Sequence, residues 1–124
     1  MKAIEQSVVQ EYINKFANKD VYIHLETTNG AYASHFDEKA YNVGAFIRNA
    51  QVNYQHGKIV STGGSFRVGL KLDLGWVYAE GLSDFEFDEH GRLLMAGHDR
   101  EGRLMVALEI SEKPFTHEAE EDES

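Results

Sequence analysis

One change of periodicity divides the chain: a single helical pattern at the start gives way to strand-like alternation over the remainder. Between Ile4 and Ala17, apolar side chains recur every three to five residues, the spacing of one face of an α-helix. From Val21 onward they recur at every second position, through Ile23 and Leu25, as in a half-buried strand. A single amphipathic helix has to bury its apolar stripe, so it must pack on the strands that the rest of the chain forms.

Turn signals at short intervals divide the region after residue 20 into short strands. Asn29-Gly30 is a strong hairpin signal between two alternating runs. The apolar run at 43–54 is long for one strand, so it is predicted to bend or bulge near Asn49. Segments 90–96 and 101–107 repeat a similar glycine turn followed by apolar residues, a pattern typical of a β-meander.

These patterns predict a mainly β fold: a barrel-like or curled sheet, mixed or antiparallel, of about seven to eight strands with one N-terminal amphipathic helix. A helix lying on one open antiparallel sheet is the alternative architecture. We expect a single domain over residues 1–116, with the helix at about 4–18 and the strands within about 21–110. Residues 117–124 hold five of the 21 acidic residues and no Lys or Arg. They are predicted to be a disordered acidic tail, with an acidic interaction tail as the alternative.

Composition excludes several classes of function. The chain has no cysteine, so it has no disulfide, thiolate nucleophile or thiolate metal ligand. Its formal net charge of −9 argues against binding to nucleic acid or to an anionic membrane surface. No apolar run is long enough to cross a membrane, and the first residues show no secretory pattern, so we expect a cytoplasmic protein.

His24 and Glu26 form the first candidate site, because residues two apart share one face of a strand. Such a pair could supply two metal ligands, or a base with its orienting carboxylate. It could equally be a solvent-exposed or hydrogen-bonded polar pair. No spacing in the sequence supplies a third metal ligand, although four residues could in principle: His35, His56, His98 and Glu80. We therefore expect no metal and no cofactor.

Trp76, Tyr78 and Glu80 form the second candidate site, again on one strand face. Two aromatic rings followed by a carboxylate could form a stacking platform for a sugar ring. The alternative is that both rings belong to the core of the β fold. Glu80 would then need a partner on a buried face. Arg48 and Arg67 are both available, and a buried Arg48–Glu80 pair is the structural expectation.

Six segments together resemble the YojF-like family, a group of small uncharacterised proteins from bacilli and their relatives. The segments are 21–28, 46–50, 66–71, 76–82, 92–98 and 110–115. The resemblance implies a mostly β, barrel-like mixed sheet with an N-terminal helix, and it brings no assigned catalytic residues. Members resemble products of genes beside a zinc-dependent N-deacetylase of bacillithiol synthesis. That adjacency implies a shared pathway or a physical partnership.

A non-catalytic accessory or binding protein, associated with bacillithiol-pathway deacetylation, is the function we expect. The sequence has no Gly-x-Ser-x-Gly and no phosphate-binding loop, which disfavours nucleophilic or nucleotide chemistry. The alternative is a protein that uses both candidate sites, either to bind a sugar-like small molecule or to act on one as an enzyme. The candidate ligand- or partner-binding residues are His24, Glu26, Arg48, Trp76, Tyr78 and Glu80. The expected partner is the N-deacetylase; a homodimer is left open.

Overall fold

The computed structural model describes residues 1–28 and 44–116. Within these ranges the chain forms one helix and nine strands, several of them close to the segments expected from the alternation. In chain order they are β1 (Lys2–Ala3), α1 (Gln6–Lys15), β2 (Val21–Thr28), β3 (Gly44–Val52), β4 (His56–Ser61), β5 (Phe66–Lys71), β6 (Trp76–Leu82), β7 (Asp84–Phe87), β8 (Leu93–His98) and β9 (Leu104–Ser111). The hairpin turn expected at Asn29-Gly30, the alternating run that follows it and the acidic tail expected at 117–124 lie outside the described residues.

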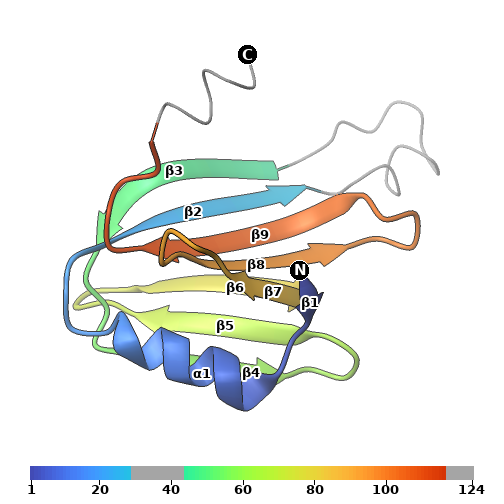
Figure 1. Ribbon diagram of the computed structural model, residues 1–124, viewed down its shortest axis with the longest axis horizontal. Helices are drawn as coiled ribbons and strands as arrows, with labels where there is room; N and C mark the ends of the chain where they lie inside the picture. Colours follow the sequence, from blue (N-terminus) through green and yellow to red (C-terminus); the bar gives the residue numbers. More distant parts are fainter. Residues whose placement is uncertain (29–43, 117–124) are drawn as a thin grey trace.

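The strands form two antiparallel sheets (Figure 1). The large sheet has the order β1-β7-β8-β9-β2-β3 and the small sheet the order β4-β5-β6. The mainly β architecture is confirmed. The barrel-like sheet is not, because the described strands form two sheets and close no barrel. The count of seven to eight strands was also low, because β1 is only two residues long and carries no alternation to detect.

A sharp corner joins the two sheets. Leu82, the last residue of β6, pairs with Phe66 in the small sheet, whereas Asp84, two residues on, pairs with Ala96 in the large sheet. Between them the backbone N–H of Ser83 donates to the carbonyl of Ala96 at 2.9 Å. The chain thus changes sheets within two residues, which is how curled β structures turn without leaving backbone groups unpaired.

Helix α1 packs beside β4, an edge strand of the small sheet (Figure 1). The side chain of Gln10 accepts from the N–H of Ile59 at 3.0 Å and donates to the carbonyl of Gly57 at 2.8 Å. These bonds occupy backbone groups that an edge strand would otherwise leave open to another chain. Gly57 also permits the approach, since a Cβ there would overlap the Ile13 side chain. The helix is a little shorter than the expected 4–18.

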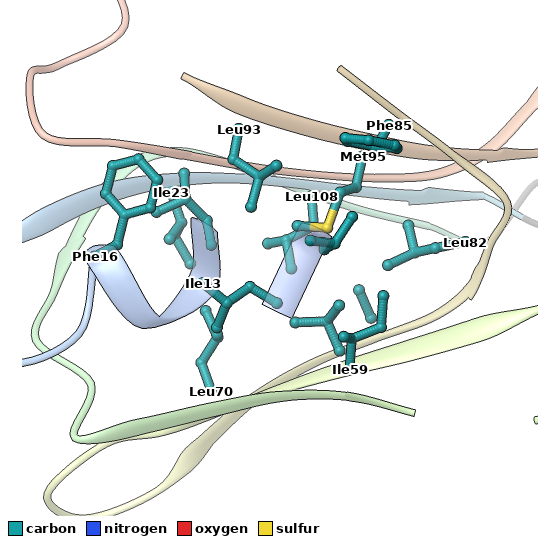
Figure 2. Packing of buried hydrophobic residues seen from close by; sticks show 14 of the residues in the cluster. Ile13, Phe16, Ile23, Ile59, Leu70, Leu82, Phe85, Leu93, Met95 and Leu108 are labelled. Atoms are coloured by element: carbon teal, nitrogen blue, oxygen red, sulfur yellow. The ribbon is translucent and has the colours of Figure 1, made fainter. Parts of the chain in front are cut away.

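The core lies between the helix and the facing sides of the two sheets (Figure 2). Val68 and Leu70 on β5 are completely buried, while Arg67 before them and Lys71 after them are half-buried on the opposite face. This strand therefore alternates between a core face and an outer face. Other strands contribute by the same alternation, and the cluster includes Ile13, Phe16, Ile23, Ile59, Leu82, Phe85, Leu93, Met95 and Leu108.

The bulge expected near Asn49 is present in β3. Ile23 pairs with Ala50 and His24 with Arg48, so Asn49 is the extra residue opposite β2. Asn49 has a φ of 60°, in the left-handed region that asparagine tolerates better than most residues. No helix in the described part of the chain is long and apolar enough to span a membrane.

Candidate functional site

The two candidate sites lie on different sheets. His24, Glu26 and Arg48 belong to β2 and β3 of the large sheet, on the face opposite the core residues Val21 and Ile23. A second group, Trp76, Tyr78 and Glu80, belongs to β6 of the small sheet, on the face opposite Val77 and Ala79. Each group occupies the outer face of its own sheet. The structure therefore does not bring the two candidate sites together.

His24 is the centre of a polar cluster on the large sheet, although it is only 5% exposed. Its Nε2 lies 3.1 Å from a Glu26 carboxylate oxygen, and its Nδ1 lies 3.3 Å from an Arg48 guanidinium nitrogen. Glu109 on the neighbouring strand β9 approaches the same guanidinium at 4.0 Å. We call His24, Glu26, Arg48 and Glu109 the polar cluster. His24, its one buried member, has a polar partner at each ring nitrogen, which is what burial of an ionisable group requires.

A cover over the polar cluster was not foreseen from the sequence. Phe115 lies only 2% exposed, outside the main core, with its ring 4.8 Å from the Arg48 guanidinium and 5.9 Å from that of Arg92. The side chain of Asn49 clamps the Phe115 backbone: it accepts from the N–H at 2.6 Å and donates to the carbonyl at 3.0 Å. The segment after β9 thus folds back over the outer face. Of the residues that hold this segment in place, the sequence had singled out only Asn49, as the expected site of a bulge.

Two carboxylates beside the cover have shifted pKa values, in opposite directions. Burial raises the pKa of Glu109, and the nearby charges of His24, Arg48 and Arg92 only partly oppose the rise. Burial also acts to raise the pKa of Asp88, but hydrogen bonds from the backbone and side chain of Arg92 outweigh it, so this pKa lies below its ordinary value. The Arg92–Asp88 ion pair is short, at 2.6 Å.

The polar cluster does not extend to a metal site in the described part of the chain. His24 and Glu26 are adjacent, as expected, but three of the proposed third ligands lie on other strands: His56 on β4, His98 on β8 and Glu80 on β6. His35 is outside the described residues. Among residues 1–28 and 44–116, no group of three or more His, Asp or Glu side chains could hold a metal ion.

Trp76 and Tyr78 are exposed, which rules out the alternative that both rings belong to the core. Each is 52% exposed, and their rings stack with centroids 5.3 Å apart and an angle of 11° between planes. Gly69 on β5 makes room for the Tyr78 ring, because a Cβ at that position would lie 2.9 Å from it. The Lys71 ammonium lies 5.2 Å from the Trp76 ring centroid. We call Trp76, Tyr78 and Lys71 the aromatic face.

The expected Arg48–Glu80 pair does not form, because the two residues lie on different sheets. Glu80 instead pairs with Arg67, its neighbour on β5, at 3.1 Å. Both side chains are substantially exposed, so this ion pair contributes little to stability. Its position beside Tyr78 nevertheless completes a surface with aromatic, acidic and basic groups side by side.

A pocket of about 790 Å³ opens next to this surface. Tyr78, Glu80 and Gly81 at the end of β6 form one side. The hairpin between β8 and β9 forms another, and the end of β2 a third, with Val106 and Met105 among the apolar lining. The sequence did not reveal this pocket, because it is built from three segments that are distant along the chain. His24, Glu26 and Arg48 are not part of its lining.

Comparisons with known proteins match nearly the whole described fold. The family described as "Protein of unknown function (DUF1806)" matches residues 3–115. The "Uncharacterized protein YojF" of Bacillus subtilis (strain 168) is 53% identical over 116 residues, which is 94% of this chain and 99% of that protein. The crystal structure of Bacillus subtilis YojF superposes with a TM-score of 0.75 at 47% identity, covering 93% of this chain and 96% of that one. The resemblance found in the sequence is thereby confirmed.

Proposed function

This chain belongs to the DUF1806 family of proteins of unknown function, and from that premise we propose that it is a non-catalytic binding protein acting through the aromatic face. The observation that carries the proposal is the half-exposed, stacked pair Trp76–Tyr78 on an outer sheet face. Aromatic side chains are enriched in the cores of protein interfaces, where burying them contributes most to affinity.

The state of the other polar residues supports a role without chemistry. His24 is held between Glu26 and Arg48 and lies beneath Phe115, so its ring is not presented to solvent. Glu80 is engaged by Arg67. Catalysis by general acid and base needs groups within hydrogen-bond reach of one substrate, and these two sites are on different sheets.

The partner we propose is the N-deacetylase of the bacillithiol pathway, in the cytoplasm. The proposal rests on what the resemblance to the YojF-like family implies, namely that members correspond to genes beside one for such an enzyme. A deacetylase supplies the hydrolytic metal site that this chain's described residues do not assemble. In this proposal the aromatic face docks on the enzyme and modulates it, and this chain does not turn over the substrate.

Titration calorimetry of the untagged protein against the purified deacetylase tests the proposal. We expect a Kd below about 10 μM, which corresponds to about −7 kcal/mol or better. Trp76→Ala should weaken binding about tenfold or more, because it removes the largest exposed ring of the aromatic face. Leu74→Ala is the control: Leu74 is 97% exposed in the adjacent turn and is not part of the aromatic face. Undetectable binding at high micromolar concentrations, together with unchanged deacetylase rates, contradicts the proposal.

A second candidate function is binding of a small sugar-like molecule. The observation that favours it is the pocket beside the aromatic face, which is lined in part by Tyr78 and Glu80. The enzymatic version of this candidate required His24 and Glu26 to join the same site, and they line a different face. We therefore retain the candidate for ligand binding alone.

A further inference from the structure

The pocket at the end of β6 is suited to one chemical class of ligand. We propose that it binds an electrically neutral, polyhydroxylated ring, that is, a sugar without a charged substituent. The inference rests on the second candidate function, ligand binding beside the aromatic face, and deepens it by naming what the pocket selects. It does not depend on the deacetylase.

The shape and apolar lining provide for the ring. A volume of about 790 Å³ lies within the range of small-molecule sites and accommodates a mono- or disaccharide. Tyr78 forms an aromatic wall, and its ring is backed by the stacked Trp76. Ala79, Met105 and Val106 add apolar lining. The C–H face of a sugar ring is apolar enough to stack on an aromatic ring of this kind.

The polar lining provides for hydroxyl groups. Thr27 and Tyr78 present hydroxyls, which both donate and accept hydrogen bonds. Glu80 and Glu101 present carboxylates, which only accept, and Arg100 presents a guanidinium, which only donates. A sugar hydroxyl is both donor and acceptor, so it can form a hydrogen bond with each of these groups.

The balance of charge in the lining selects against an ionised ligand. Three carboxylates, of Glu80, Asp99 and Glu101, face the guanidiniums of Arg100 and Arg103 in the pocket, and Glu80 is paired with Arg67 outside it. Arg103 itself bridges Asp99 and Glu101. The local charge is therefore compensated, so an ion of either sign would lose its hydration there without meeting an uncompensated opposite charge. A neutral ligand carries no net charge that the charged groups of the lining could attract or repel.

The only tryptophan of the chain is a built-in reporter for the test, since Trp76 stacks on the wall of the pocket. Methyl glucoside and maltose are titrated against the full chain and followed by Trp76 fluorescence and by backbone amide shifts. Glucuronate and glucosamine serve as charged counterparts. We expect saturable binding of a neutral sugar, at least about tenfold tighter than either charged one, with amide shifts at Gly81 and at residues 99–106.

Two sets of variants test the site itself. Tyr78→Ala should weaken binding about tenfold or more, Tyr78→Phe only slightly because the ring remains, and Leu74→Ala not at all. Arg100→Gln should shift preference towards glucosamine and Glu101→Gln towards glucuronate, since each leaves an opposite uncompensated charge. Both residues are exposed at a hairpin tip, and their substitution should leave the fold intact.

Three results would overturn the inference: no saturable response to either neutral sugar up to about 10 mM, tighter binding of a charged sugar, or full binding in a folded Tyr78→Ala variant. If sugar binding is absent while the deacetylase still binds through Trp76, the pocket inference fails and the main proposed function stands. If sugar binds and the deacetylase does not, the reverse holds.

Discussion

The outer faces of the two sheets are built from the same kinds of side chain, yet these side chains differ in how far they are exposed to solvent. Each has an aromatic ring, a guanidinium and a carboxylate on neighbouring strands. On the large sheet Phe115 lies against His24 and Arg48, and His24 is only 5% exposed. On the small sheet no described segment covers Trp76 and Tyr78, and each is 52% exposed.

This difference shows that a covering segment, and not residue type, decides what a sheet face can do. Beneath Phe115, His24 and Arg48 find their partners within the sheet, because the cover limits their access to water. On the aromatic face the rings and charges are accessible to a partner or a ligand. The covered face therefore contributes to stability, and the open face is where we place binding.

The largest expected effect concerns the core that both faces share. Leu70→Ala should lower the free energy of unfolding by about 2–5 kcal/mol, because Leu70 is completely buried between the helix and the small sheet. Lys71→Ala, one residue along the same strand, should cost less than about 0.5 kcal/mol, because it lies on the open face. Urea unfolding of both variants measures the difference. Equal losses would contradict the assignment of the two sides of β5.

Removing the cover tests the comparison directly. Phe115→Ala should cost about 3 kcal/mol, because it creates a cavity over the polar cluster and opens its charges to water. Trp76→Ala is the matched variant on the open face and should cost less than about 1 kcal/mol, although Trp is the larger side chain. Thermal and chemical unfolding provide both values. A greater loss for Trp76→Ala would mean that the aromatic face, not Phe115, supports the fold.

Substitution of Asn49, whose side chain holds the Phe115 backbone, should have an intermediate effect on the free energy of unfolding. Asn49→Ala removes both hydrogen bonds to the Phe115 backbone and places alanine at a φ of 60°, for a combined cost of about 2 kcal/mol. Asn49→Gly also removes the bonds but accepts the left-handed backbone, so its cost should be about 1 kcal/mol. Hydrogen exchange at Phe115 should rise in both variants. Unchanged exchange there would show that packing of the ring alone holds the segment.

The smallest effect is a dependence of stability on pH that only the covered face should produce. Burial raises the pKa of Glu109, so the folded protein holds that proton to a higher pH than the unfolded chain does. Its contribution to the free energy of unfolding therefore falls as pH rises from about 4.5 through the raised pKa. Glu109→Gln should abolish this fall, so the variant should gain stability relative to the parent as pH rises.

Asp88 provides the opposite sign in the same region. Its pKa is lowered, because hydrogen bonds from Arg92 outweigh burial, so its contribution is present above the ordinary pKa of 3.8 and is lost as pH falls through the lowered one. The free energy of unfolding, measured from pH 2 to pH 7 in the Glu109→Gln and Asp88→Asn variants, should separate the pH range in which each carboxyl changes stability. Slopes of the same sign in both variants would contradict the pKa assignments.

Several features followed from local sequence. The helix, the alternation of β5 and the bulge at Asn49 were predictable because each depends on residues close together in the chain. The pairing of His24 with Glu26 was predictable for the same reason, since residues two apart share a strand face. The partner of Glu80 was not: Arg67 and Arg48 were equally available in sequence, and only the pairing of β5 with β6 brought Arg67 beside it.

Alternation along a strand determines which side chains share a face, because successive residues point to opposite sides. The amino-acid sequence by itself therefore determined the mainly β class, the single helix in the described region and the membership of each candidate group. Alternation carries no information about what lies above a face, because a cover comes from a segment tens of residues away whose position depends on the packing of every strand between. Only the tertiary structure decided that Phe115 buries His24, that Trp76 and Tyr78 stay open, and that three distant segments enclose a pocket beside them.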